Sequence, residues 1–417
     1  MAQLSADADA FGPMLTIEQA AERAAERITA VAGIETVALT AADGRVLAQD
    51  IVAPVDLPPF ANSAVDGYAV RFADLTLSGE TRLPLSGRVP AGADAAGVTT
   101  AGIAVRVFTG APMPADADTV FMQEDVALDA DCVVLPAGLK RGANARPAGE
   151  DLPYGHVALA AGRRLRPQDL ALLAALGVTE LSVRRRVRVA IFSTGDELNE
   201  PGTPLPPAGI YDANRSLLRA LVARTGAEVV DLGILRDEPE SLAGRLREAA
   251  VDCDLILTSG GVSTGEEDHV KAAVERAGEL AFWRVAIKPG RPVAMGVVAG
   301  TPFIGLPGNP VAVFVTFAFV ARTAIALLSG TKRARLHGLP VRLSFAYKKK
   351  AGRREYVRVS LVPGQDGIAV ARKHPRDGAG VLTSLTETDG LVELADELTS
   401  VAEGTIAPFL AYEMLTG

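Results

Sequence analysis

The sequence holds few of the residues that build disulfide frameworks or soft-metal sites. Two cysteines, Cys132 and Cys253, lie far apart in a chain of 417 residues, and the four histidines are scattered. These numbers exclude a disulfide scaffold, argue against a zinc site, and favour a reducing compartment. The N-terminus has no basic start followed by an apolar core, so we expect no signal peptide and a cytoplasmic location.

The sequence also lacks an excess of positive charge. Lys and Arg number 42 against 50 Asp and Glu, which gives a net charge of −8. Because nucleic-acid binding normally needs a basic face, we expect no nucleic-acid partner. The longest apolar run, Val311 to Leu328, contains Arg322 and lies between turn signals. It predicts a buried helix and no membrane span.

The length and the changes of pattern along the chain predict several domains. Residues 1–14 are small, polar and patternless, and we expect them to be disordered. A capping-box sequence, Thr16 to Gln19, predicts the start of a helix that runs on to Gly33. From Thr36 to about Leu181, short β-rich runs are separated by Gly, Pro and Asp clusters, which indicates a β-rich region with long loops.

Strand and helix patterns alternate in the next region. The expected strands are 187–192, 228–232 and 255–257, and the expected helices are 213–225, 239–250 and 268–277. This alternation predicts a doubly wound parallel sheet with helices on both faces, whose ligands lie at the carboxyl ends of the strands. After Gly330, short strands separated by turns predict a small all-β module.

The most informative stretch follows the strand at 255–257. It begins with the small-residue loop Ser259 to Gly265 and continues into the carboxylates Glu266, Glu267 and Asp268. Adjacent glycines let a backbone approach an anion, and a helix N-terminus adds its positive dipole end. Carboxylates beside that anion can hold a divalent cation. The stretch indicates chemistry on a phosphorylated or oxo-anionic substrate.

Other interpretations of this loop are less favourable. Acidic residues in a first helical turn are ordinary partners of the helix dipole. Gly261 to Gly265 also spells the nucleophile elbow of serine hydrolases around Ser263, with His374 as a nominal base. No His-Gly-Gly oxyanion stretch occurs, however, and three carboxylates follow the elbow directly. The Walker pattern is absent.

Carboxylates recur at the ends of all three expected strands. Each one alone could be a helix cap, but together they face one crevice, where their repulsion requires a cation. Oxygen-only ligation favours Mg²⁺. The predicted metal ligands are Asp196, Glu197, Asp237 and Asp268.

Cationic residues follow at 284–291. Arg284, Lys288 and Arg291 can neutralise an oxyanion, and Lys288 is held at a turn by the following Pro-Gly. Residues 305–311 then open the long apolar helix, with Asn309 as the expected N-cap. This junction is either a plain strand–turn–helix connection or an additional anion site.

Six segments together carry a family resemblance. They are 62–70 (NSAVDGYAV), 108–111 (FTGA), 193–198 (STGDEL), 258–263 (TSGGVS), 286–290 (AIKPG) and 306–310 (LPGNP). In order and spacing they resemble the molybdopterin molybdenumtransferase (MoeA) family, the bacterial counterpart of the gephyrin E domain. The resemblance runs from about Leu15 to the C-terminus.

The resemblance implies a multidomain architecture. It comprises a discontinuous N-terminal domain I at 15–52 and 146–183, a β-rich domain II at 53–145, a MogA-like doubly wound α/β domain III at 184–330, and a C-terminal β-barrel-like domain IV at 331–417. It also implies a homodimer whose active cleft combines domain III of one chain with domain II of the other.

The implied reaction inserts molybdate into adenylylated molybdopterin, with Mg²⁺-assisted release of AMP. Molybdate is the expected substrate, although tungstate has nearly the same size and charge. Expected partners are the molybdopterin adenylyltransferase and molybdoenzyme maturation proteins. Two alternatives stay open: a non-catalytic dimeric scaffold of the gephyrin type, and nucleotide chemistry without molybdenum.

Carried over by position, the resemblance assigns roles to individual residues. The implied catalytic residues are Asp66, Thr109, Glu197, Asp237, Asp268 and Lys288. The implied substrate-binding residues are Ser193, Thr194, Gly195, Ser259, Gly260, Gly261, Ser263, Arg284, Pro307, Gly308, Asn309 and Arg353. Two positions depart from the family pattern: Arg284 replaces a common lysine, and Ala379 replaces a common serine, so their expected substrate contacts change.

Overall fold

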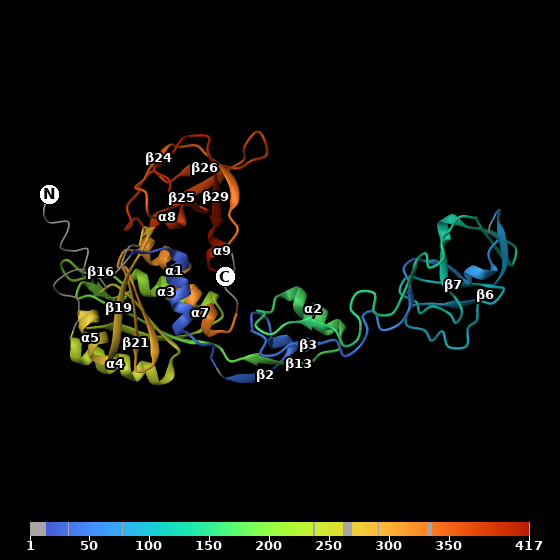
Figure 1. Cartoon of the computed structure of the whole chain (residues 1–417), viewed down its shortest axis with the longest axis horizontal. Coiled ribbons are helices and arrows are strands. Elements are labelled where there is room, and N and C mark those ends of the chain that lie inside the picture. The colour runs from blue at the N-terminus through green and yellow to red at the C-terminus, as the bar shows by residue number, and fades with distance from the viewer. Residues whose placement is uncertain are drawn as a thin grey trace.

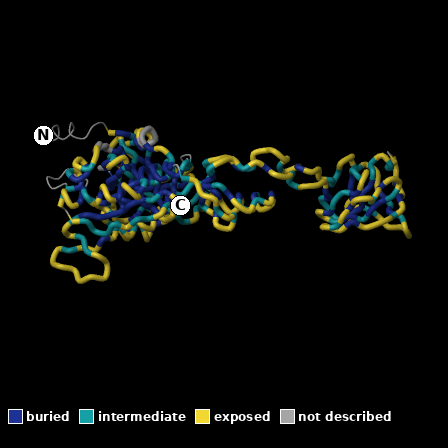
Figure 2. Tube along the Cα trace, turned by 90° about the horizontal axis from the view of Figure 1, so that it is seen from below, coloured by how far each residue is buried: buried dark blue, intermediate teal, exposed yellow. Residues whose placement is uncertain are grey.

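The chain forms an elongated molecule with a large body at one end and a small β domain at the other. The computed structural model describes residues 14–31, 33–76, 78–236, 238–261, 269–290, 292–331 and 336–416. In Figure 1 a narrow middle segment joins the two ends. Figure 2 shows that the buried residues concentrate in the two end bodies, while the connection is largely exposed.

The large body is built on a seven-stranded sheet with the order β1-β19-β21-β22-β18-β14-β17. Its strands are β1 (Met14–Leu15), β14 (Arg188–Thr194), β17 (Glu228–Leu235), β18 (Leu255–Ser259), β19 (Gly278–Val285), β21 (Pro292–Val298) and β22 (Thr301–Leu306). A short pair, β15 (Leu198–Asn199) and β16 (Ile210–Tyr211), projects beside it. The expected strands and helices of this region are all present, with boundaries shifted by one to three residues.

Helices cover both faces of the sheet. They are α1 (Ile17–Arg27), α3 (Ala213–Arg224), α4 (Pro239–Asp252), α5 (His269–Ala277), α6 (Pro310–Thr316), the π-helical η5 (Phe317–Ala321) and α7 (Arg322–Leu328). Along β14, Val189 and Ile191 join the core formed with α3 and α6, whereas Ala190 and Phe192 join the core formed with α4 and α5. This alternation follows the two-residue period of a strand buried on both faces.

The sheet is mixed, which corrects the expectation of a parallel sheet. The strands β17, β14, β18 and β22 run parallel, but β21 is antiparallel to both β22 and β19. Only Ala299 and Gly300 separate β21 from β22. A connection this short can return the chain only in the antiparallel direction.

The first described segment belongs structurally to the large body. Met14 is ordered in β1, which pairs with β19, so the expected disorder does not extend to residue 14; residues 1–13 lie outside the described residues. The capping box is formed, with Gln19 N donating to Thr16 Oγ1 at 3.2 Å and Thr16 N donating to Gln19 Oε1 at 2.9 Å. Residues 15–27, the start of the expected domain I, therefore pack against the α/β body.

The helix after the capping box is shorter than expected. It ends at Arg27 and does not reach Gly33. Beyond it, Ile28 and Val31 are buried, and Val31 N donates to Leu328 O at 2.8 Å. This tertiary contact uses a backbone donor that a continuing helix would need for itself.

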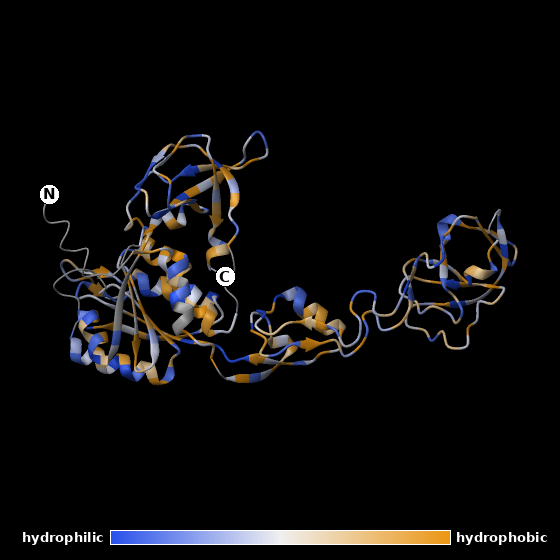
Figure 3. Cartoon of the chain, viewed as in Figure 1, coloured by the Kyte–Doolittle hydropathy of each residue, from blue (hydrophilic) through white to orange (hydrophobic). Residues whose placement is uncertain are grey.

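The middle segment and the distal domain are β-rich. The middle contains β2 (Ile34–Ala38), η2 (Leu39–Ala41), β3 (Ile51–Val52), β12 (Val157–Leu159), α2 (Pro167–Ala175) and β13 (Glu180–Arg184). The distal domain contains β4 (Asn62–Ser63), β5 (Gly67–Val70), η3 (Phe72–Asp74), β6 (Thr81–Val89), β7 (Ala104–Val107), β8 (Thr119–Met122), η4 (Gln123–Asp125), β9 (Ala127–Asp129), β10 (Cys132–Leu135) and β11 (Ala145–Arg146). Figure 3 shows hydrophobic residues on α2 and on the strands beside it, where the small core of the middle segment lies.

The C-terminal module is a closed five-stranded barrel, as expected. It contains β23 (Leu339–Leu343), β24 (Tyr347–Lys348), β25 (Arg354–Val362), β26 (Val370–Lys373), α8 (Thr383–Thr386), β27 (Gly390–Leu394), β28 (Ser400–Val401), β29 (Ile406–Ala411) and α9 (Tyr412–Thr416). The ring closes because β25 pairs with both β26 and β27. Strand β20 (Ile287–Lys288) belongs in sequence to the α/β domain, between β19 and β21, and adds to the barrel beside β25.

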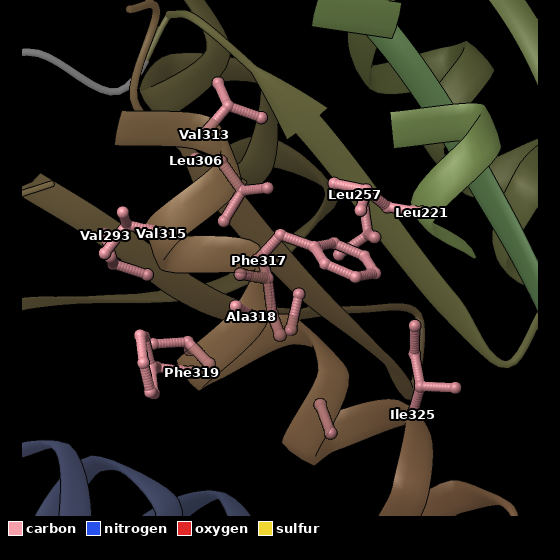
Figure 4. Close-up of a cluster of buried hydrophobic side chains, with 14 of the residues drawn as sticks. Leu221, Leu257, Val293, Leu306, Val313, Val315, Phe317, Ala318, Phe319 and Ile325 are labelled. Carbon is pink, nitrogen blue, oxygen red and sulfur yellow. The ribbon is translucent and has the colours of Figure 1, made fainter. Parts of the chain in front are cut away.

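The long apolar helix lies in the core of the large body. By length and hydropathy the helix Pro310–Leu328 could cross a membrane, but 78% of its most apolar segment is buried inside the protein. Figure 4 shows Phe317 and Ile325 of this helix packed with Leu221 of α3 and Leu257 of β18. The sequence prediction of a buried helix is confirmed.

Candidate active site

A pocket lies between the α/β domain and the C-terminal barrel. Its volume is about 860 Å³, which is large enough for a nucleotide-sized ligand. One wall comes from the carboxyl ends of β14, β18 and β22, the position where doubly wound sheets bind ligands. The other wall comes from β20, β24, β25 and the chain after β26. The predicted site at the strand ends therefore coincides with a pocket.

Two glycines after β18 bring the backbone to the pocket surface. Gly260 and Gly261 have φ of +89° and +65°, a left-handed conformation that side chains disfavour. A Cβ on Gly261 would lie 2.3 Å from Val270 Cγ2 and 3.0 Å from Thr194 Cγ2. The N–H of Gly260 donates to Leu306 O at 3.0 Å. This amide is therefore not free to bind an anion, which differs from the expectation for the loop.

A substitution at Gly261 should be destabilising for steric reasons. We expect Gly261→Ala to unfold at lower urea than Gly202→Ala, with a difference of about 1–3 kcal/mol in the free energy of unfolding. Gly202 also has a positive φ, +92°, but a Cβ there meets no atom within 4 Å. The comparison isolates the overlap with Val270, and equal stabilities would contradict it.

The ends of β14 and β22 complete this wall. Thr194, Gly195 and Glu197 line the pocket after β14. Pro307, Gly308 and Asn309 line it between β22 and α6, where Asn214 Nδ2 donates to Gly308 O at 2.6 Å. Asn309 is the N-cap residue, as predicted, but its side chain makes no capping hydrogen bond.

On the opposite wall, two of the predicted cations, Lys288 and Arg353, donate hydrogen bonds to one carboxylate. Glu355 is 1% exposed and accepts hydrogen bonds from Lys288 Nζ at 3.0 Å, Arg353 Nε at 2.8 Å and the Tyr347 hydroxyl at 3.0 Å. Burial alone would lower the pKa of Lys288, but its bonds to Glu355 and Tyr347 outweigh burial and raise it. Lys288 is therefore a permanent cation at neutral pH.

Several pocket residues were not identified from the sequence. The polar ones are His269, Tyr347, Glu355, Tyr356, Arg358, Lys373 and Asp377, and His374 lines the pocket as well. A usable signal was the presence of Arg354, Glu355 and Arg358 inside β25, a strand that is otherwise largely apolar. His374, considered as a hydrolase base, is buried, and its Nε2 lies 2.8 Å from Glu387 Oε2. Ser263 of the suggested elbow lies outside the described residues.

Apart from Asp66 and Thr109, the predicted site residues lie in the pocket, next to it, or outside the described residues. Those in the pocket are Thr194, Gly195, Glu197, Gly260, Gly261, Lys288, Pro307, Gly308, Asn309 and Arg353. Ser193 and Ser259 are buried beneath its wall, and Asp196 is exposed outside its lining. Asp237, Ser263, Asp268 and Arg291 lie outside the described residues, as does the side chain of Arg284.

The predicted metal ligands are only partly placed. Of the four, Glu197 lines the pocket and Asp196 does not. Within the part of the chain that the structure describes, no three His, Cys, Asp or Glu residues gather as metal ligands would. Because Asp237 and Asp268 fall outside that part, the Mg²⁺ site stays a prediction.

Asp66 and Thr109 form an ordered pair in the distal domain. The Asp66 carboxylate accepts from Thr109 N at 2.8 Å and from Thr109 Oγ1 at 2.9 Å. The backbone bond, followed by the hydroxyl bond, lowers the pKa of Asp66, which keeps this exposed carboxylate ionised. The pair lies between β4 and β5 and after β7, at the opposite end of the molecule from the pocket (Figure 1). Within one chain the two sites do not meet.

Comparison with known families covers nearly the whole chain. Residues 15–177 match the MoeA N-terminal region (domain I and II), residues 190–326 match a probable molybdopterin binding domain, and residues 340–412 match the MoeA C-terminal region (domain IV). The first match spans α1 and most of the middle and distal regions, the second the α/β body, and the third the barrel.

Individual relatives agree. The chain is 37% identical over 402 residues to a molybdopterin molybdenumtransferase of Haemophilus influenzae, which covers 95% of this chain and 99% of that protein. It is 38% identical over 380 residues to molybdopterin molybdenumtransferase 2 of Mycobacterium tuberculosis, with 89% and 93% covered. The crystal structure of the molybdopterin biosynthesis moeA protein from Pyrococcus horikoshii superposes with a TM-score of 0.81 at 30% identity, covering 96% of this chain and all of that one. The chain belongs to the molybdopterin molybdenumtransferase (MoeA) family.

Proposed function

We propose that this protein inserts molybdate into adenylylated molybdopterin and releases AMP, a step of molybdenum cofactor biosynthesis in the cytoplasm. The observation that carries the proposal is a single pocket that holds the close-approach glycines Gly260 and Gly261 together with the cations Lys288 and Arg353. The names of the relatives give the substrate class. Tetrahedral oxyanions and phosphates both require such cationic partners.

In this proposal the cations stabilise the charge that moves during transfer. Lys288 supplies a compact ammonium and Arg353 a planar guanidinium, so one can follow a moving oxygen while the other holds a fixed pair of oxygens. The glycines let the flat pterin or the diphosphate approach the sheet edge without side-chain interference. Mg²⁺, held by Glu197 with Asp237 and Asp268, would add positive charge beside the diphosphate.

We further propose that the active unit is a homodimer. Thr109 holds the Asp66 carboxylate in place and keeps it ionised, but the two residues are distant from the pocket of their own chain. A second copy of the chain could bring its own pair to that pocket. The elongated shape supports this arrangement, because a long arm with a small distal domain can reach across a partner. The adenylyltransferase would deliver substrate, and maturation proteins would receive the product.

A reconstituted reaction tests the proposed activity. Purified protein incubated with adenylylated molybdopterin, Mg²⁺ and molybdate should yield molybdenum cofactor and AMP in equal amounts. Omission of molybdate is the control, and tungstate in its place measures the metal preference. Release of neither product would reject the activity and leave the scaffold interpretation. Accumulation of adenylylated pterin from ATP and free molybdopterin would instead favour nucleotide chemistry.

A further inference from the structure

Glu355 joins the two domains that form the pocket. In the parallel pairing of β20 with β25, Lys288 lies opposite Glu355 and Ile287 lies opposite Arg354. The Arg354 amide also donates to Ala286 O at 2.7 Å. Lys288 thus arrives from the α/β domain and Arg353 from the barrel, and one carboxylate receives both. Glu355 is placed to set the position of one cation relative to the other.

The hydrogen-bond geometry leaves the outer donors of both cations unused. Lys288 uses two of its three donors, one to Glu355 and one to the Tyr347 hydroxyl at 3.3 Å. Arg353 donates from Nε alone, and its two terminal nitrogens have no partner among the described residues. The Arg353 side chain is 17% exposed and lines the pocket, so a ligand bound there can reach these donors.

The charges of these three side chains do not cancel. Lys288 and Arg353 contribute two positive charges and Glu355 one negative charge, so the trio has a net charge of +1. Burial would raise the pKa of Glu355, but its bonds to Lys288 and Tyr347 outweigh burial and lower it, which keeps the carboxylate ionised. A buried carboxylate requires its cations, and the cations therefore cannot both turn away toward a ligand. An anion bound beside the trio would therefore meet a net charge of +1 and not the full +2 of the two cations.

We propose that Glu355 is a positioning residue: it orients Lys288 and Arg353 toward one oxyanion and limits how tightly that oxyanion is held. The inference rests on the proposed transferase function. Tyr347 supports the same arrangement, because its hydroxyl bridges Lys288 and Glu355 and its ring lies 5.7 Å below the Lys288 ammonium. Removing the carboxylate should therefore affect anion binding and turnover differently. The lost negative charge increases the attraction for an anion, whereas the lost hydrogen bonds leave Lys288 and Arg353 without fixed positions.

The test compares Glu355→Gln with the wild type. Glutamine preserves size and removes the charge, so we expect kcat to fall by about 10- to 100-fold, the effect of a small misplacement of catalytic groups. We expect the KM for molybdate to stay equal or fall. Titration calorimetry with molybdate alone should show affinity equal to or greater than that of the wild type. Glu355→Asp, which restores the charge on a shorter stem, should recover part of kcat.

Glu393→Gln provides the matched control. Glu393 is a second partly buried carboxylate of the barrel; it bonds to the Tyr356 hydroxyl at 3.2 Å and faces Arg354, but it does not line the pocket. Its loss should lower the melting temperature without changing kcat per folded molecule. If Glu355→Gln does not fold, Tyr347→Phe removes one bond to the same carboxylate and should lower kcat by a smaller factor with no loss of molybdate affinity.

The possible outcomes separate the two proposals. Wild-type kcat in a folded Glu355→Gln protein, or weaker molybdate binding by it, overturns the role of Glu355. Parallel losses of melting temperature, affinity and turnover would indicate a merely structural carboxylate and overturn it as well. If the wild-type protein forms no product, the transferase function fails, and the calorimetric comparison still decides whether Glu355 restrains anion binding.

Discussion

An equimolar mixture of Asp66→Ala and Lys288→Ala chains should regain about a quarter of the wild-type transferase activity, although each variant alone has almost none. The reason is geometric: each pocket would need Lys288 from one chain and Asp66 from the other. Random exchange places half of the molecules in mixed dimers, and each mixed dimer has one intact pocket of two. Activity measured after subunit exchange checks this value.

The control is a mixture of two variants of the same domain. Asp66→Ala with Thr109→Ala should not recover activity beyond that of Thr109→Ala alone, because every pocket then faces an altered distal pair. Mass spectrometry of differently tagged chains establishes that mixed dimers form. If they form and the first mixture stays inactive, the site is built within one chain, and a large movement of the arm would be needed to close it.

Lys288→Ala should lower kcat/KM by about 100- to 1,000-fold, the usual effect of removing one donor that stabilises developing charge. The change also leaves the buried Glu355 carboxylate with Arg353 as its remaining cation, so the melting temperature should fall. Steady-state kinetics and thermal unfolding on the same preparation separate the two effects.

Lys348→Ala is the matched control for this substitution. Lys348 is an exposed residue of β24 that does not line the pocket, so its removal deletes the same charge from a neighbouring strand. We expect kinetics and stability close to those of the wild type. A similar loss in both variants would show that the overall charge of the barrel matters and that a directed contact from Lys288 does not.

The sequence predicts the elements of the α/β body well, because their patterns are local. Buried strands such as β14 and β18 are short apolar runs, and the helices α3 and α4, which lie between them in the chain, show helical spacing. The direction of β21 was not predicted, since apolar runs contain no information on strand direction. The early end of α1 was missed for a related reason: the bond from Val31 to Leu328 joins positions about 300 residues apart.

The site was predicted in part for similar reasons. Gly260, Gly261 and Lys288 belong to recognisable turns at strand ends, and the resemblance to a family covers them. Glu355 and Tyr347 belong to strands of another domain, and only the tertiary pairing of β20 with β25 brings them to Lys288. A charged residue inside an apolar strand indicates that a partner exists. Its identity depends on a contact between domains that no local pattern encodes.

The long apolar helix has a consequence for the order of synthesis. The strands β14, β18 and β22, which cover one side of it, precede it in the chain and are available when it leaves the ribosome. The remaining contacts come from residues that are synthesised after the helix. Tyr356 stacks on Phe319 with ring centres 4.3 Å apart, and Leu410 and Leu415 join the same core. Until the barrel and α9 are made, a nascent chain presents a helix whose apolar surface resembles a membrane segment. The helix therefore reaches its native position only if it packs against the α/β sheet before it contacts another apolar environment.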